Sequence, residues 1–312
     1  MGLIDDMLSG DERALSRLMT IIENDMEARK QILKRIHNRT GKAHIIGFTG
    51  PPGIGKSTLV SQVAAEYLNR NKRVGVVAID PSSPFSLGAI LGDRIRMTNN
   101  EGKDHLFIRS LASRGKLGGL SLATNDTIKL LEAFGKDVIL VETVGIGQSE
   151  VDIAKTAHTT VVVLAPELGD DIQSMKAGVL EIGDLFVVNK SDLDGAHRAY
   201  VDLKGAIALN FKESKWLPKV FKVIAKEGEG IGELVDNIDL HYKFVKENDL
   251  LESFNHKRIL NDIENNLINW VQIEVMAYLK EDKEGKMFVE KIYEKELDEV
   301  STIEQIIKRF VN

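Results

Sequence analysis

The sequence lacks cysteine, long apolar runs and any basic excess. Without cysteine, the 312 residues cannot form disulfides, thiolate zinc sites, iron–sulfur clusters or a cysteine nucleophile. Uninterrupted apolar runs such as 161–165 have the length of a strand, far below the roughly 18–20 residues that span a bilayer. The net charge of −6 disfavours nucleic-acid binding. Asp5 and Asp6 do not fit a signal peptide. We therefore expect a cytoplasmic protein with no membrane or nucleic-acid partner.

Short apolar runs alternate with helix-length stretches from His44 onward. The runs are rich in β-branched residues and cover 44–49, 74–79, 105–110, 138–142, 160–165, 185–189 and 220–225. Several are apolar throughout, as in strands that are covered on both faces. Helices are expected between them, for example over 57–69, 120–134 and 195–212. The alternation predicts an α/β fold with a doubly wound, mostly parallel sheet.

Helical patterns flank this core on both sides. Residues 1–43 predict an N-terminal extension of two amphipathic helices joined near 23–25, and the core is expected over 44–240. Residues 241–312 predict a helical C-terminal part. It contains a long helix with apolar residues at 259, 263, 267 and 270, and a break at Gly285.

A glycine-rich segment indicates a phosphate-binding loop. Its residues match G-x-x-x-x-G-K-[ST] and are Gly50, Pro51, Pro52, Gly53, Ile54, Gly55, Lys56 and Ser57, followed by Thr58. A predicted strand precedes the loop and a predicted helix follows it, so backbone N–H groups and the helix N-terminus would both face an anion. We expect Lys56 to reach the β- and γ-phosphates and Ser57 to ligate Mg²⁺.

A second motif points to guanine. Asn189, Lys190 and Asp192 form the N-K-x-D pattern at the end of a predicted strand. The Asp192 carboxylate can accept from N1–H and the N2 amino group of guanine, whereas adenine would leave it unpaired. The Lys190 stem can lie along the ring face. Further base contacts are expected from the backbone at 224–226, namely Ile224, Ala225 and Lys226, where Ile224 replaces a common serine.

The Mg²⁺-binding residues of the nucleotide site are predicted at the end of the strand 138–142. Glu142 is expected to hold Mg²⁺ through a water, and the N–H of Gly145 to sense the γ-phosphate. Ile146 replaces the usual water-orienting Gln, which predicts slow intrinsic hydrolysis that a partner accelerates. Asp80 and Asp93 are further candidate metal-side carboxylates, with a helix cap or a salt bridge as the alternative role.

Together these segments resemble the MeaB/ArgK group of P-loop GTPases, which is marked by a Glu in Walker B. The resemblance covers nearly the whole chain and is carried by 50–58, 80–85, 88–94, 142–150 and 189–192. It implies a homodimeric GTPase chaperone that gates cofactor loading and protects an adenosylcobalamin-dependent acyl-CoA mutase, chiefly methylmalonyl-CoA mutase. It also implies a dimer arm within 241–312. A third switch loop over 169–176 would use Lys176 to couple nucleotide state to the mutase.

Three other functions remain open at this stage. A kinase would pass the γ-phosphate to a protein or small molecule, although N-K-x-D disfavours ATP. A nickel-insertion GTPase would need Cys and His ligands, and cysteine is absent. A non-catalytic scaffold would tolerate the loss of Lys56.

Overall fold

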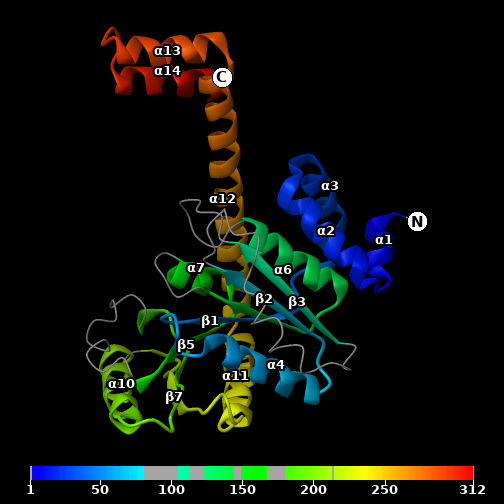
Figure 1. Cartoon of the computed structure of the whole chain (residues 1–312), viewed down its shortest axis with the longest axis vertical. Helices are drawn as coiled ribbons and strands as arrows, with labels where there is room; N and C mark the ends of the chain where they lie inside the picture. Colours follow the sequence, from blue (N-terminus) through cyan, green and yellow to red (C-terminus); the bar gives the residue numbers. More distant parts are fainter. Residues whose placement is uncertain are drawn as a thin grey trace. The chain divides into compact units, whose positions relative to one another are not determined.

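A computed structural model of the chain describes residues 2–80, 105–112, 122–143, 149–166, 180–212 and 214–311 (Figure 1). The chain divides into two compact units, Met1–Arg258 and Ile259–Asn312. The first unit contains the whole described sheet. The second contains the C-terminal part of helix α12 (Leu250–Glu281) together with α13 (Lys283–Tyr293) and α14 (Glu299–Val311). No described helix combines the length and the apolar character that crossing a membrane requires.

The described residues form a seven-stranded sheet of order β3-β2-β4-β1-β5-β6-β7. Every pair of neighbouring strands is parallel, which confirms the predicted fold class. The strands are β1 (His44–Thr49), β2 (Val74–Asp80), β3 (Leu106–Ala112), β4 (Val138–Glu142), β5 (Thr159–Leu164), β6 (Leu185–Val188) and β7 (Lys219–Lys222). All carboxyl ends therefore lie at one edge of the sheet, which is where open α/β sheets bind ligands.

The last strand is shorter than the sequence pattern predicts. β7 ends at Lys222, whereas the apolar run continues to Ala225. The chain leaves the sheet because the N–H of Ile224 bonds to the carbonyl of Glu229, and the N–H of Glu227 bonds back to Ile224. Of the apolar residues that follow β7, Val223 and Ala225 are thus buried and Ile224 is half-buried outside the strand.

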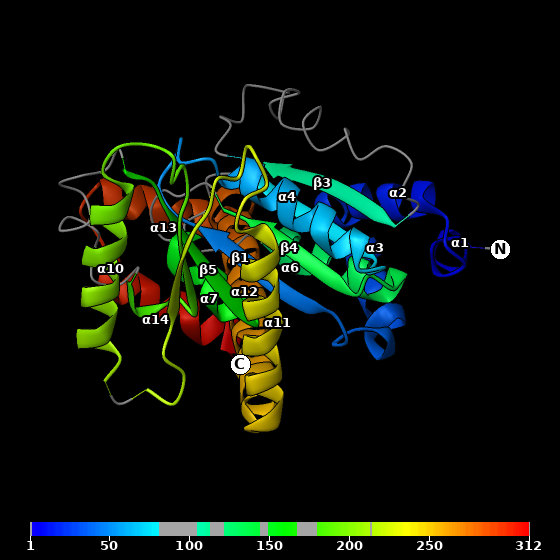
Figure 2. The ribbon, with the colours of Figure 1, turned by 90° about the horizontal axis from the view of Figure 1, so that it is seen from below.

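Helices cover both faces of the sheet, as its apolar strands require. Helices α4 (Lys56–Asn69) and α11 (Ile231–Glu247) pack on one face against residues such as Ile46 and Phe48, and both lie in front of the sheet in Figure 2. Helices α6 (Leu122–Phe134) and α7 (Ser149–Thr156) pack on the opposite face against Ile45 and Ile139. Helix α10 (Ala196–Asn210) covers β5 and β6. Every residue of β1 is buried as a result.

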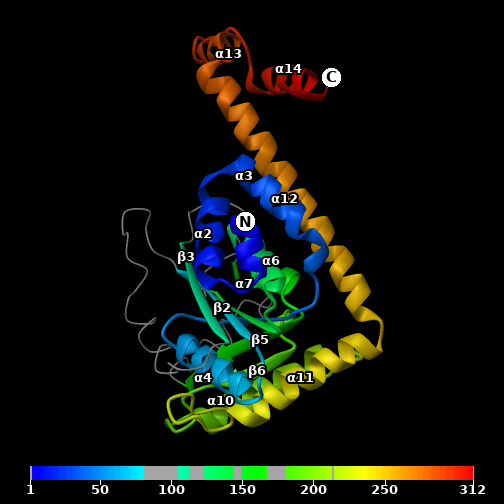
Figure 3. The same ribbon diagram turned by 90° about the vertical axis from the view of Figure 1, so that its right-hand side faces the viewer.

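The N-terminal helices form a further layer on the α6 side (Figure 3). Two predicted helices are confirmed as α2 (Glu12–Asn24) and α3 (Met26–Ile36), and a short α1 (Leu3–Leu8) precedes them. Asp25 separates α2 from α3, because its carboxylate accepts from the first N–H groups of α3. A buried ion pair at 2.5 Å joins Arg29 of α3 to Asp126 of α6. The layer is therefore attached by charge as well as by apolar contacts.

In the second unit, the predicted break at Gly285 is wrong. The chain breaks at Asp282, whose carboxylate accepts from the N–H of Glu284 and caps α13, while Gly285 is buried inside α13. A Cβ at Gly285 would lie 2.1 Å from the carbonyl oxygen of Tyr278. The glycine permits close approach of α13 to the last turn of α12, and the sequence pattern does not distinguish this use from a helix break.

Three histidines are buried at the amino ends of β1 and β5. The Nε2 of His44 and the Nδ1 of His241 each lie 2.9 Å from the Thr159 hydroxyl. The Nδ1 of His158 accepts from the N–H of Ile45 at 3.0 Å. Burial lowers the pKa of His158 to about 3 and that of His241 to about 4, and it holds the pKa of His44 well below its usual value. All three imidazoles are therefore neutral at pH 7.

This network predicts loss of stability in mild acid. The folded pKa of His158 lies below the unfolded value of about 6.5, so the unfolded chain binds more protons below pH 6.5. His158 alone should lower the free energy of unfolding by about 1.4 kcal/mol between pH 7.5 and 5.5. We expect His158→Gln to be less stable than wild type at pH 7.5 in urea unfolding, with the difference shrinking at pH 5.5. The exposed His256→Gln should keep the wild-type pH dependence, and equal slopes for all three proteins would contradict the assignment.

Candidate nucleotide-binding site

The glycine-rich loop leaves the carboxyl end of β1 and enters α4 through a conformation that needs its glycines. Gly50, Gly53 and Gly55 have φ values of 139°, 80° and 88°, in the left-handed region that glycine tolerates. A Cβ at Gly50 would lie 2.2 Å from the carbonyl oxygen of Val163 on the neighbouring strand β5. The loop is thus held tightly against the sheet where the predicted phosphate site lies.

Lys56 places a positive charge inside this loop. Its ammonium donates to the carbonyls of Gly50 and Pro51, each at 2.7 Å, and the residue is buried. Lys56 is also the first residue of α4. The unpaired N–H groups of a helix N-terminus and a lysine ammonium both favour an anion, so this arrangement is suited to the phosphates of a nucleotide.

The two residues predicted to hold the metal are in contact. The Ser57 hydroxyl, at the start of α4, donates to the Glu142 carboxylate at 2.7 Å, at the end of β4. A hydroxyl and a carboxylate supply the hard oxygen ligands that Mg²⁺ prefers. In the described part of the chain, no group of three or more His, Asp or Glu side chains could hold a metal by itself. A Ser–Glu pair fits an ion that takes its remaining ligands from water and nucleotide phosphates.

Asn189, which follows β6, bonds both to the phosphate loop and to the loop after β7. Its side-chain NH₂ donates to the carbonyl of Ile54 at 2.8 Å, and its side-chain oxygen accepts from the N–H of Ala225 at 3.0 Å. The residue is buried, and a Cβ at Gly55 would lie 2.6 Å from its amide nitrogen. Sequence reasoning assigned Asn189 to the base alone. Only the fold shows that it also connects segments separated by 135 residues.

The rest of the N-K-x-D segment forms a tight turn after β6. Lys190 has φ 54°, which is uncommon for a residue with a side chain. Two backbone hydrogen bonds hold the turn. The N–H of Ser191 donates to the carbonyl of Val223, and the N–H of Leu193 donates to the carbonyl of Lys190. Lys190 is half-buried and Asp192 is exposed. The Ala225 N–H, predicted to approach the base, donates to Asn189 instead.

Other predicted residues are described only in part. Asp80 is the last residue of β2, two positions beyond Ala78, which pairs with Glu142. Its backbone thus lies at the same sheet edge as Glu142, but its side chain lies outside the described residues. Asp93, Gly145 and Lys176 also lie outside the described residues.

Comparison with known proteins gives relatives whose names assign them to the GTPases. Residues 15–282 match the family described as methylmalonyl Co-A mutase-associated GTPase MeaB. A Pyrococcus abyssi protein whose name assigns it to the GTPases is 45% identical, covering 99% of this chain and 96% of the relative. GTPase ArgK of Escherichia coli is 36% identical over 72% of this chain and 70% of the relative.

The fold also matches a solved structure over nearly its whole length. The crystal structure of a LAO/AO transport system kinase aligns with a TM-score of 0.70 at 24% identity, covering 99% of this chain and 97% of that one. At this identity the likeness concerns the fold. The family match and the sequence relatives carry more: the chain belongs to the MeaB family of methylmalonyl-CoA mutase-associated GTPases, enzymes that hydrolyse GTP to GDP and phosphate.

Proposed function

We propose that this GTPase is a nucleotide-dependent chaperone that gates adenosylcobalamin loading and protects a cobalamin-dependent acyl-CoA mutase. The observation that carries the nucleotide part is the convergence of the phosphate loop, the Glu142 strand and the N-K-x-D turn at one sheet edge, with Asn189 bonded to both neighbouring loops. The family's own description supports the mutase part. A cytoplasmic location remains a prediction from the sequence.

Guanine recognition is assigned to the turn after β6 and the loop after β7. Asp192 would accept from N1–H and the N2 amino group, and the Lys190 stem would lie along the ring. The N–H of Ala225 donates to Asn189, so we assign the contact to the guanine carbonyl to the N–H of Lys226, next along the chain from Ile224 and Ala225. This assignment makes Asn189 a positioning residue for both loops.

Phosphate and metal binding are assigned to residues 50–58 and to Glu142. The loop amides and Lys56 would bind the phosphates, and Ser57 and Glu142 would hold Mg²⁺, with Asp80 and Asp93 as further candidates on the metal side. Mg²⁺ would neutralise charge that develops on the phosphate oxygens during hydrolysis. Gly145 would sense the γ-phosphate, and Lys176 in the 169–176 loop would transmit the nucleotide state to the mutase.

The mutase client is proposed from relatives rather than from the fold. A mouse protein named methylmalonic aciduria type A homolog, mitochondrial, is 34% identical over 76% of this chain and 61% of its own length. An adenosylcobalamin-dependent enzyme of the methylmalonyl-CoA or isobutyryl-CoA mutase type fits the family description. The kinase alternative makes a different chemical prediction, namely transfer of the γ-phosphate to an acceptor other than water.

A homodimer formed through 241–312 is the third part of the proposal. Along α12, side chains such as Ile263, Leu267 and Trp270 are roughly half exposed and recur at helical spacing. The same helix also exposes Ile259, Leu260, Ile268, Val271, Ile273 and Met276. Monomeric proteins rarely expose so continuous an apolar stripe, and a second copy of the arm would cover it.

Asp192→Asn should move base preference from guanine toward xanthine. The amide oxygen can still accept from N1–H, but the amide NH₂ replaces the acceptor for the N2 amino group of guanine and can donate to the second carbonyl of xanthine. We expect GTP affinity to fall about tenfold to a hundredfold and affinity for xanthosine triphosphate to rise, measured by calorimetry. Asp194→Asn, at an exposed position two residues further on, is the matched control. Unchanged GTP selectivity in Asp192→Asn would refute the base assignment.

Hydrolysis should be slow alone and at least tenfold faster with an adenosylcobalamin-dependent methylmalonyl-CoA mutase, because the chain lacks the usual water-orienting Gln after Gly145. Single-turnover assays with γ-labelled GTP measure the rate and the destination of the label. Lys176→Ala should bind GTP normally and lose the stimulation. Label on a protein or metabolite, rather than in inorganic phosphate, would favour the kinase.

The full chain should scatter light with twice the 34.7 kDa mass of one copy. An Ile263→Asp, Leu267→Asp double variant should shift the population to monomers at micromolar concentration, because buried carboxylates oppose association. Val201→Asp, at a half-exposed apolar position on α10, should stay dimeric. A wild-type chain that is monomeric at high concentration would exclude this arm as a dimer interface.

A further inference from the structure

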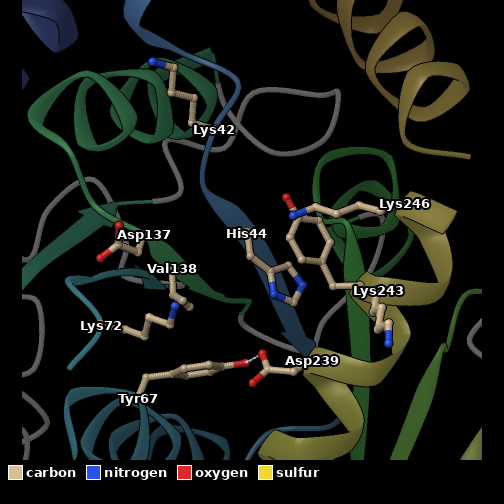
Figure 4. A pocket seen from close by; sticks show the side chains of 10 residues that line it. Lys42, His44, Tyr67, Lys72, Asp137, Val138, Asp239, Lys243 and Lys246 are labelled. Atoms are coloured by element: carbon tan, nitrogen blue, oxygen red, sulfur yellow. Dashed lines mark hydrogen bonds between the residues drawn. The ribbon is translucent and has the colours of Figure 1, made fainter. Parts of the chain in front are cut away.

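A cavity lies at the sheet edge opposite the phosphate loop (Figure 4). It has a volume of about 470 Å³ and is formed by the amino ends of β1 and β4, the C-terminal end of α4 with the loop that follows it, and α11. Because the sheet is parallel, none of these amino-terminal positions takes part in the nucleotide site. The cavity has the size of a small-molecule site and is not explained by the proposed GTPase function.

Positive charge dominates the walls of this cavity. Lys42, Lys72, Lys243 and Lys246 line it, and Figure 4 shows the first two and the last two on opposite sides of His44. The carboxylates of Asp137 and Asp239 are the acidic groups in the lining. Four ammonium groups thus face two carboxylates. The net charge in the cavity depends on whether other groups already neutralise those carboxylates.

Both carboxylates have partners other than the lysines. Asp137 accepts from the backbone N–H of Arg73 at 2.8 Å and from its guanidinium at 3.1 Å. Burial raises the pKa of Asp137, but these hydrogen bonds outweigh that and leave it below its usual value. Asp239 accepts from the Tyr67 hydroxyl at 2.9 Å, the dashed line in Figure 4, and lies 3.6 Å from the Arg70 guanidinium. Arg73 therefore offsets the charge of Asp137, whereas Arg70 is closer to Glu66 and Asp236, so Asp239 keeps part of its negative charge.

The lysines, in contrast, have weak or no ionic partners. Lys243 lies 3.6 Å from Glu247, and both groups are well exposed, so this pair contributes little. The described residues place no carboxylate within 4.0 Å of the Lys42 or Lys72 ammonium. The charge of Lys72 lowers the pKa of Asp137 and of Asp239, but only from a longer distance. The cavity therefore keeps a net positive potential.

The Tyr242 ring in the cavity wall already has two partners. The Lys246 ammonium lies 4.0 Å from the centre of the Tyr242 ring, and the His44 ring stacks on Tyr242 at 3.9 Å with an angle of 4°. The Tyr242 ring is therefore already in contact with an ammonium group and with a second ring. We expect charge to contribute more than ring stacking to the binding of a ligand here.

We propose that this cavity is a second binding site, separate from the nucleotide site, for a small soluble polyanion that carries a phosphate or pyrophosphate group. Lys42 and Lys72 on one wall and Lys243 and Lys246 on the other supply the charge. A concave site lined by one sign of charge concentrates its field and favours a multiply charged ligand over a singly charged one. Ammonium groups bind phosphate oxygens as point charges through charge-assisted hydrogen bonds.

Inorganic pyrophosphate is the probe for this site. The full chain is held in excess GDP without added Mg²⁺, which would complex the probe, and titrated by calorimetry. We expect saturable binding at one site. Lys42→Gln and Lys72→Gln should each raise the Kd by about tenfold, and the double variant should raise it further. Lys215→Gln removes an equal charge from an exposed loop of the same unit and should leave the Kd unchanged.

The design separates this site from the phosphate loop. Pyrophosphate bound at the loop would not respond to Lys42 or Lys72, which lie at the opposite edge of the sheet. GDP affinity, measured on the same variants, should be unchanged and reports correct folding. An absence of saturable pyrophosphate binding would overturn the proposal, as would binding that only Lys215→Gln weakens or that all three variants weaken equally. If the wild-type chain instead bound GDP and ADP equally well, that result would contradict the proposed guanine site, and the pyrophosphate titration would still test this cavity.

Discussion

The parallel pairing of β1 with β4 and β5 is the constraint on which the rest of the structure depends. In register, Phe48 lies beside Glu142 and Thr49 beside Val162. This pairing brings the start of the phosphate loop next to the metal-side carboxylate, although 85 residues separate Ser57 from Glu142. Full burial of β1 on both faces stabilises the pairing, since a register slip would carry every apolar side chain to a different neighbour.

The same parallelism gives the sheet two chemically different edges. The carboxyl edge presents backbone N–H groups, the start of α4 and oxygen ligands, all suited to a nucleotide with its metal. The amino edge presents buried neutral histidines beside a lysine-lined cavity. Helix α4 passes from one edge to the other, with Lys56 at its first residue and Tyr67 near its end, so a single rigid element contributes to both edges.

Particular residues show how far sequence reasoning reached. The strands around the phosphate loop and Glu142 were predicted almost to the residue, because fully buried parallel strands are apolar throughout and end abruptly at polar residues. The end of β7 and the role of Gly285 were not predicted. An apolar run in a buried turn resembles a strand, and a glycine that admits a neighbouring helix resembles a helix break. Asn189 was assigned to the base, and its bonds to Ile54 and Ala225 were missed.

By itself the sequence determined the alternation of strands and helices, the phosphate loop, the N-K-x-D segment and the family resemblance. These are local patterns, in which spacing along the chain and the side-chain chemistry carry the information. Tertiary structure alone decided that Asn189 bonds to both Ile54 and Ala225, and that lysines from three separate segments surround one cavity. The physical reason is that such contacts depend on strand order and helix placement. Long-range packing selects these, and no short stretch of sequence encodes them.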